Sequence, residues 1–474
     1  MTVPPFNLPE GFRFGVATAG FQVEGGFNGP GQPRNNWYRW EASGRIEPSG
    51  IALDFWNRYE EQLDRAVAAG CDAFRLSVEW ARCEPAEGEI DAKALDHYAA
   101  ILDACRDRGL QPVVTLHHFT HPAWLGEDFW LHGHAPERFA SWARIAVGHL
   151  MGRCQHWVTI NEMNILAMQS YFAGTFPPGR LLAAGDAVRA LDHMLTAHVL
   201  TYREIHHLQP GALVAPNNYA FSIYELDRLL TDLLLARRYQ VDRQNLREWL
   251  TDRRSSYYAS LPSPPLADLF FRRLVATLVP LDRALPRAVA AIYESPHLCT
   301  LDVAQFDYYD PIISHHLRLP GHRTAGGRNW LPGRLLWDEH PNPGGLVEYS
   351  RLNHEPGMQV WIVENGMCNR VNGRSYQRLD GWDRVRYLQA NLAAVVRAID
   401  IGIPLGSYFH WTLGDNYEWG SYQPRFGLYG VDRRHGIQWS HLDSMGKNAA
   451  GAFRRIVEGL RAGDRSVLGM IPDG

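Results

Sequence analysis

The stretch Trp361-Ile362-Val363-Glu364-Asn365-Gly366 runs from three apolar residues into a carboxylate and then into an Asn-Gly turn signal. A short run that is apolar on both faces and ends at a turn is typical of a buried parallel strand. In a barrel of such strands, the carboxyl ends open onto the active site. A second stretch, His156-Trp157-Val158-Thr159-Ile160-Asn161-Glu162, has the same pattern. The sequence therefore predicts two glutamates, Glu364 and Glu162, at the carboxyl ends of two strands.

The rest of the chain alternates short strand-like runs with helical patterns. The other predicted strands are 12–19, 73–80, 112–119, 213–218, 305–309 and 404–411. The predicted helices are 54–69, 92–108, 136–151, 186–208, 383–401 and 442–460. Eight strands that alternate with helices favour an α/β fold in which a parallel sheet closes into a (β/α)8 TIM barrel. Because no Gly/Ser or Pro linker divides the chain, we interpret residues 1–474 as one catalytic domain.

Two long insertions fall where βα loops of this barrel are expected, on the active-site face. Residues 221–296 are helical and rich in Arg and Leu, and residues 317–356 are rich in Pro and Gly. Within the first, residues 266–293 are amphipathic and are interrupted by Pro280 and Pro286. This pattern fits a packed pair of lid helices, or a surface for a dimer partner or an apolar aglycone.

Bulk composition limits the classes of partner and site. The 474 residues carry a net charge of -4, which gives no support for a nucleic acid or an anionic membrane as partner. Six scattered cysteines, without a Cys-x-x-Cys pair, argue against a disulfide framework or a metal site. We see no signal peptide and no apolar span of about 20 residues, so we expect a cytoplasmic protein. The sequence does not indicate an oligomeric state.

The residues around the two glutamates match the needs of glycosidic-bond cleavage. A retaining glycosidase needs one ionised carboxylate as nucleophile and one protonated carboxyl as acid, in different surroundings. Arg75 lies in the middle of a predicted strand, where a cation beside Glu364 would keep it ionised and lower its pKa. Tyr309 could donate its hydroxyl to the same carboxylate. Glu162 follows an apolar strand and neighbours a second carboxylate, which raises its pKa toward the acid role, and Asn161 could bind the sugar 2-hydroxyl.

Five motifs resemble those of glycoside hydrolase family one, the retaining β-glycosidases. Thr159-Ile160-Asn161-Glu162-Met163 is similar to the acid/base motif Thr-x-Asn-Glu-Pro of that family, and Ile362–Gly366 to its nucleophile motif Ile/Val-Thr-Glu-Asn-Gly. The other three are Phe12–Ala19 leading to Gln22 and Glu24-Gly25, Phe74-Arg75-Leu76-Ser77, and Asp415-Asn416-Tyr417-Glu418-Trp419 followed by Arg425-Phe426-Gly427-Leu428. The matches run from about residue 7 to residue 460.

This resemblance implies further roles around the sugar. Hydroxyls of the sugar at the non-reducing end would be bound by Gln22, His118, Asn161, Glu418 and Trp419. Trp411 would form the stacking floor beneath the sugar, and Trp337 would flank the aglycone. Each Trp taken alone is as consistent with a core or barrel-rim residue, and His118 alone with a structural histidine. Family members that act on 6-phosphorylated sugars lack the glutamate at position 418 and carry a phosphate-binding Ser/Lys set, so Glu418 predicts a non-phosphorylated glycone.

The chain departs from the family pattern at four positions near these motifs. Met163 stands where the family has Pro, Val363 where it has Thr, Phe119 where it has Trp, and Asp307 where it has Asn. Residues 221–296 also lack the Gly-Asp-Tyr-Pro element of the family. Asp307 adds a third carboxylate, which if ionised would raise the pKa of Glu162 or Glu364. These departures suggest unusual handling of the aglycone.

The sequence thus predicts a retaining exo-β-glycosidase, similar to a β-glucosidase, that hydrolyses terminal non-reducing β-glycosyl residues. Two alternatives stay open: a transglycosylase that passes the same covalent intermediate to an apolar acceptor, and a sugar-binding protein without catalysis. No cofactor or metal is implied, and the expected partner is a β-linked glycoside or oligosaccharide. The residues do not separate glucose from galactose, fucose or mannose.

Overall fold

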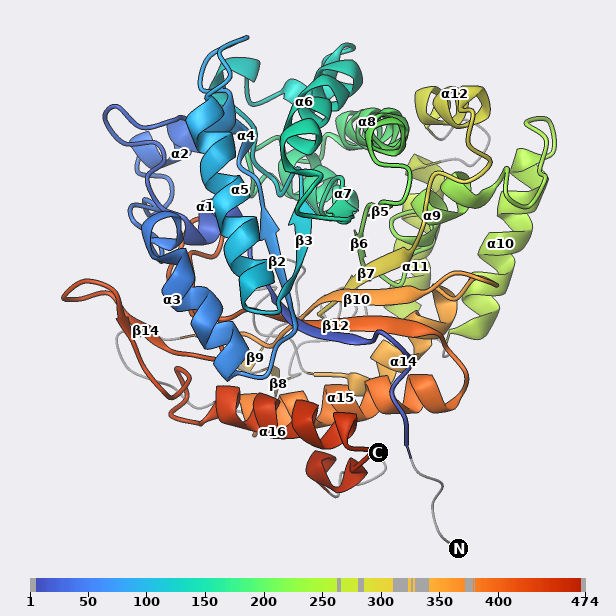
Figure 1. Cartoon of the computed structure of the whole chain (residues 1–474). Coiled ribbons are helices and arrows are strands. Elements are labelled where there is room, and N and C mark those ends of the chain that lie inside the picture. The colour runs from blue at the N-terminus through green and yellow to red at the C-terminus, as the bar shows by residue number, and fades with distance from the viewer. Residues whose placement is uncertain are drawn as a thin grey trace, which may run out of the picture.

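A closed barrel of parallel strands forms the centre of the molecule (Figure 1). The computed structural model describes residues 6–261, 266–279, 285–309, 323–324, 327–328, 341–370, 378 and 380–469, with the backbone alone for 266–271, 323–324, 327–328 and 370. The barrel strands are β1 (Arg13–Ala17), β2 (Ala73–Ser77), β3 (Gln111–Thr115), β4 (His156–Val158), β5 (Leu213–Ala215), β6 (Asn218–Tyr219), β7 (Ala304–Tyr308), β10 (Val360–Asn365) and β12 (Leu405–Trp411).

β5 and β6 together occupy one strand position of the barrel, and the sheet closes at this interrupted position. The order of pairing is β5-β4-β3-β2-β1-β12-β10-β7-β6, and every pairing is parallel. β5 pairs with β4, whereas β6 pairs with β7, and only Pro216 and Asn217 separate β5 from β6 along the chain. The nine strands therefore fill eight strand positions, in agreement with the predicted (β/α)8 barrel.

Helices surround the barrel and bury its outer face (Figure 1). The long ones are α3 (Phe55–Ala68), α5 (Ala92–Asp107), α6 (Ala135–Leu150), α8 (Ala184–Leu208), α15 (Arg384–Asp400) and α16 (Ala449–Arg461). Short helices in the loops are α1 (Gly20–Val23), α2 (Tyr38–Ala42), α4 (Trp80–Cys83) and α7 (Met163–Ala167). The barrel strands are buried almost throughout, as expected for strands that have side chains on one face and helices on the other.

The predicted boundaries of strands and helices agree with the structure to within a few residues, with one exception. The last helix was expected to begin at 442, but α16 begins at Ala449. The residues before it form a turn in which the Asp443 carboxylate accepts hydrogen bonds from the backbone of Met445 and Lys447. Asn448 then caps α16 by accepting from the backbone of Gly451. Side-chain competition for backbone donors delays the start of the helix.

The first insertion is helical, as predicted, and lies between β6 and β7. It contains α9 (Arg228–Leu235), α10 (Leu246–Ser260), α11 (Leu266–Leu278) and α12 (Pro286–Glu294), and Pro286 occupies the first turn of α12. Ala288, Val289 and Ile292 of α12 are buried, whereas Leu274 and Leu278 of α11 are more than one-third exposed. α12 is thus a packed helix, and α11 keeps part of an apolar face in solvent. Pro280 lies outside the described residues.

Half of the second insertion, 317–356, lies outside the described residues. Its described part holds α14 (Pro343–Leu352) and the two-residue strands β8 (Arg323–Thr324) and β9 (Gly327–Arg328), which pair with each other. Two further short pairs join β11 (Asn369–Arg370) to β13 (Pro424–Arg425) and β14 (Val431–Asp432) to β15 (Gln438–Trp439).

Two other findings concern the chain as a whole. None of the six cysteines, all of which lie in the described part of the chain, forms a disulfide, and five of them are buried. None of the described helices combines the length and the apolar character that crossing a membrane requires.

Candidate active site

Polar side chains gather at the carboxyl ends of the barrel strands. Glu364 is the fifth residue of β10 and Arg75 is the third of β2. Asn161 and Glu162 follow β4, and Tyr309 follows β7. Because parallel strands end at the same side of a barrel, side chains far apart in the sequence meet there.

Both oxygens of the Glu364 carboxylate have a donor. Arg75 Nη1 lies 2.5 Å from Oε1, and the Tyr309 hydroxyl donates to Oε2 at 2.7 Å. The side chain of Arg75 is fully buried and that of Glu364 is 5% exposed. The cation on one oxygen and the phenol on the other hold this buried carboxylate in one orientation, and both contacts work in favour of its ionised form.

Arg75 also fixes the neighbouring groups. Its Nη2 donates to Asn161 Oδ1 at 2.6 Å, its Nε donates to Thr115 Oγ1 at 3.1 Å, and Nη1 also reaches the Val363 carbonyl at 3.3 Å. A single guanidinium therefore joins β2, β3 and β10 to the residue before Glu162. This planar fork of donors explains why an arginine occurs in the middle of a barrel strand.

Glu162 has the opposite environment. It is 6% exposed, and its Oε1 has no hydrogen-bond partner among the described residues. Its backbone has a φ of 37°, in the left-handed region that costs a non-glycine residue about 1–3 kcal/mol. Burial, then the negative charges of Asp307 and Glu364, raise its pKa well above the ordinary value, and the charge of Arg75 lowers it. Glu162 is therefore a carboxyl that keeps its proton.

The direction of the pKa shift of Glu364 differs from the expectation from the sequence. Burial raises the pKa of Glu364, and Arg75 and Tyr309 lower it without fully offsetting the loss of hydration. The contribution of Arg75 has the predicted sign, but the net direction was wrong because burial was not counted. The contrast between the two carboxyls remains, since Glu364 has two stabilising donors and Glu162 has like charges around it.

A second polar group surrounds Glu418. Trp411 Nε1 donates to Glu418 Oε1 at 3.0 Å, and Gln22 Nε2 donates to Glu418 Oε2 at 3.0 Å and to the Tyr417 carbonyl at 2.8 Å. Burial raises the pKa of Glu418 to about 8, and the two donors oppose this shift. The sequence-based argument that its negative charge repels a phosphate therefore applies only in part at neutral pH.

His118 links these two groups. Asn161 Nδ2 lies 3.2 Å from His118 Nε2, and the imidazole stacks on Trp411 and Trp419 with ring centroids 5.8 and 5.7 Å away. Burial, then the charge of Arg75, lowers the pKa of His118 well below its ordinary value. His118 is therefore a neutral ring that can exchange hydrogen bonds with hydroxyl groups. Phe119 packs against Trp419, with the two ring centroids 4.9 Å apart.

The structure brings together all but one of the site residues predicted from the sequence. The exception is Trp337, which lies outside the described residues. Two contributors were missed, Thr115 and Asn217. Asn217 donates its amide to Asn161 Oδ1 at 2.9 Å and also to Asp307 Oδ2. Their positions, at the last residue of β3 and between β5 and β6, were the available signal, since polar residues at strand ends face the site.

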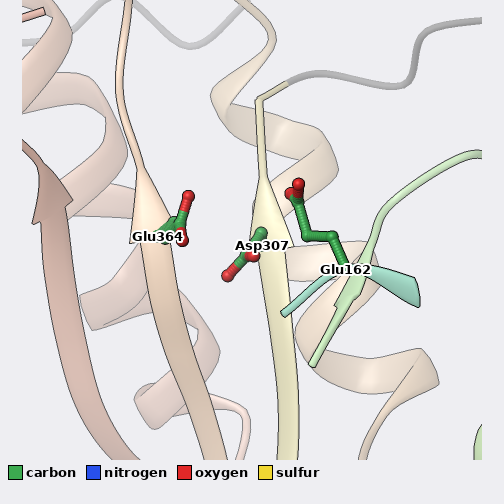
Figure 2. Close-up of side chains that lie close together, drawn as sticks. All are labelled: Glu162, Asp307 and Glu364. Carbon is green, nitrogen blue, oxygen red and sulfur yellow. The ribbon is translucent and has the colours of Figure 1, made fainter. Parts of the chain in front are cut away.

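Among the described residues, one cluster of carboxylates has the spacing of a cation site. Oxygen atoms of Glu162, Asp307 and Glu364 all lie within 4.8 Å of one another (Figure 2). Arg75 already supplies a positive charge to this cluster through Glu364.

Comparisons with known proteins agree with this geometry. The chain matches the sequence profile of Glycosyl hydrolase family 1 over residues 5–252 and 336–458. It is 28% identical to 6-phospho-beta-galactosidase 1 of Streptococcus pneumoniae, over 90% of this chain and 94% of that protein. It is 30% identical to the bifunctional beta-D-glucosidase/beta-D-fucosidase of Bifidobacterium breve, again over 90% and 94%.

A solved structure with the same fold is the beta-glucosidase from Thermotoga maritima in complex with galacto-hydroximolactam. The TM-score is 0.72 at 23% identity, over 96% of this chain and 99% of that one. The matched profile covers well over half of the chain, and its break, residues 253–335, begins within α10 and extends past β7. The chain belongs to glycosyl hydrolase family 1 and is a glycosidase.

Proposed function

We propose that the protein is a retaining exo-β-glycosidase, with residues 1–474 as one catalytic domain. The observation that carries this proposal is the contrast between two carboxyls in one site. Glu364 has Arg75 and Tyr309 on its two oxygens, and Glu162 has a buried oxygen with no partner among the described residues. Their oxygens lie within 4.8 Å, which fits the short separation of carboxyls in retaining enzymes.

In the first step, Glu364 attacks the anomeric carbon while Glu162 protonates the leaving oxygen. The bond from the anomeric carbon to the leaving oxygen breaks, and an ester to Glu364 forms. Arg75 and Tyr309 hold the attacking carboxylate in place without neutralising it. Asn161, fixed by Arg75 and Asn217, is positioned to bind the sugar 2-hydroxyl, a contact that strengthens in the transition state.

In the second step, Glu162 has lost its proton and acts as a base toward water. The water oxygen bonds to the anomeric carbon, its proton passes to Glu162, and the ester to Glu364 breaks. Two displacements on the same carbon return the original β configuration.

The glycone subsite is assigned to Gln22, His118, Glu418, Trp411 and Trp419. The donors and acceptors of Gln22, His118 and Glu418 suit hydroxyl groups, and the indole of Trp411 suits the apolar face of a sugar. Trp337 stays assigned to the aglycone side as a prediction from the sequence.

We infer a non-phosphorylated glycone, with glucose as the first candidate. Overall identity does not decide this point, because relatives named as acting on 6-phospho sugars and on plain glucosides are about equally similar. Glu418 supports it, since the chain has no lysine between Asp415 and Leu428 and keeps a carboxyl bound to Trp411 and Gln22. A phosphate ester would need a cation where this carboxyl lies.

The experiment is a set of initial rates on aryl β-glycosides of glucose, galactose, fucose and mannose and on the 6-phosphoglucoside. Glu364→Gln is the test variant, and Glu89→Gln, at an exposed glutamate, is its matched control. We expect turnover of a neutral sugar that is lost in Glu364→Gln and kept in Glu89→Gln. Full activity of Glu364→Gln, or turnover of the 6-phosphoglucoside alone, would contradict the proposal.

Product analysis with an added alcohol distinguishes hydrolysis from transfer. Free sugar as the main product supports a hydrolase, whereas an alkyl glycoside as the main product would make the protein a transglycosylase with the same intermediate.

A further inference from the structure

Asp307 is a third buried carboxyl between the two glutamates. It lies on β7, pairs in register with Glu364 on β10 and with Tyr219 on β6, and is fully buried. Figure 2 shows Asp307 on the strand between Glu364 and Glu162, and oxygen atoms of the three carboxyls lie within 4.8 Å of one another. The family has Asn at this position, so the charge is a property of this chain.

The charged and titratable groups that face Asp307 come from four elements. They are Arg75 on β2, Glu162 after β4, Glu364 on β10 and Tyr309 after β7. Arg75 contacts Glu364, and no ion pair to Asp307 or Glu162 occurs among the described residues. Three carboxylates thus face one cation in a buried site. Since an unpaired buried charge is costly, the cluster retains protons that isolated carboxyls would lose.

The contacts of Asp307 indicate where a proton lies. Glu162 and Asp307 are within hydrogen-bonding reach of each other. Glu162 Oε1 and Asp307 Oδ1 are both buried without a partner among the described residues. Two ionised carboxylates can only accept, so one shared proton is needed to make this contact favourable.

Asn217 breaks the symmetry of this pair. Burial, then the charge of Glu364, raises the pKa of Asp307 well above its ordinary value, and the Asn217 amide, which donates to Asp307 Oδ2, opposes this shift. The proton is therefore placed on Glu162, where the first step of the reaction needs it.

We propose that Asp307 is a positioning residue that shares one proton with Glu162 and keeps Glu162 in its acid form to higher pH. This inference rests on the proposed function. The total charge of Glu162, Asp307 and Glu364 before and after the first step supports this role of Asp307. When Glu162 gives its proton to the leaving oxygen, the pair becomes doubly negative, and in the same step Glu364 becomes a neutral ester. The total charge of the cluster stays constant, and the carboxylate of Glu162 beside ionised Asp307 is a stronger base for the second step.

The test is the pH dependence of kcat/KM in Asp307→Asn, which keeps the shape of the side chain and removes its charge. On an alkyl β-glycoside, whose departure needs an acid, we expect the alkaline limb to move down by about 1–3 pH units. On a dinitrophenyl glycoside, which leaves without protonation, this shift should be absent. The acid limb, set by Glu364, should move less, because Arg75 and Tyr309 remain.

Two variants complete the design. Asp302→Asn is the matched control, because Asp302 lies just before the start of β7, at the other end of the strand, and contacts His206 and Tyr202. Asp307→Ser removes the charge with a smaller side chain and serves if Asp307→Asn does not fold.

The outcomes separate this inference from the proposed function. An unmoved alkaline limb in a folded, active Asp307 variant would overturn the inference, as would a uniform loss of activity at every pH. A wild-type protein that turns over no β-glycoside would overturn the proposed function itself.

Discussion

Replacing Arg75 removes the only cation that contacts Glu364 among the described residues. Arg75→Met keeps much of the buried volume but leaves Glu364 with Tyr309 as its donor. Two unit charges about 4 Å apart interact by about 4 kcal/mol at an effective dielectric constant of about 20, or about three pKa units. Since Tyr309 still donates, we expect the pKa of Glu364 to rise by about 1–3 units.

The assay is kcat/KM against pH on an aryl β-glycoside. In Arg75→Met, the acid limb should move up by about 1–3 pH units, because Glu364 must be ionised to attack. Arg75→Lys is the matched control, since it keeps the charge but loses the fork that reaches Asn161 and Thr115. It should restore most of the acid limb but not the full rate. An acid limb that is the same in all three proteins would refute the assigned role of Arg75.

The same variant makes a prediction about stability. Breaking a buried pair by removing one partner costs about 3–5 kcal/mol. In Arg75→Met the pKa of folded Glu364 lies further above the ordinary value of 4.5. Between these two pKa values the folded state binds more protons than the unfolded state, so the free energy of unfolding falls as pH rises. Denaturant unfolding should thus show a larger loss at pH 8 than at pH 5. Equal losses at both pH values would contradict the pairing.

Three further predictions follow from single contacts. Tyr309→Phe deletes the 2.7 Å hydrogen bond to Glu364 Oε2, and a hydrogen bond to a charged group contributes about 1.5–3 kcal/mol. We therefore expect kcat/KM to fall by roughly 10–100-fold. An unchanged kcat/KM would be evidence against this contact. Glu162→Ala should slow alkyl glycosides far more than dinitrophenyl glycosides, and azide should restore turnover by forming a β-glycosyl azide; an α-azide would exclude the retaining route. The five buried thiols should resist Ellman's reagent at pH 8 until guanidinium unfolds the chain, and more than one fast-reacting thiol in the native protein would contradict their burial.

The sequence was sufficient to predict the strands of the barrel, because most are short, largely apolar runs that alternate with helical patterns. Glu364 and Glu162 could be found in this way, and Arg75 stood out as a cation inside a strand. Side-chain contacts that depend on which strands pair in the closed barrel could not be predicted from local sequence patterns. Asn217 joins Asn161 to Asp307 only because β5 and β6 pair with different neighbours.

The directions of pKa shifts were harder to predict than side-chain contacts. The expected contact between Arg75 and Glu364 is present, yet the net shift of the pKa of Glu364 is upward because burial outweighs the ion pair. The same burial raises the pKa of Glu418 to about 8, which weakens an argument made from its formal charge. The sequence gives the identity of a carboxyl, but its hydration depends on the packing of several strands.

Glu364 is proposed to form a covalent bond to the sugar, and trapping that bond tests this role most directly. The wild-type protein would be incubated with a 2,4-dinitrophenyl 2-deoxy-2-fluoro-β-glycoside of the preferred sugar and then examined by intact mass and peptide mapping. We predict one added fluoroglycosyl group per chain, located on Glu364 and absent from Glu364→Gln. An adduct on Glu162 or Asp307, or turnover to the α-anomer without any adduct, would contradict the account.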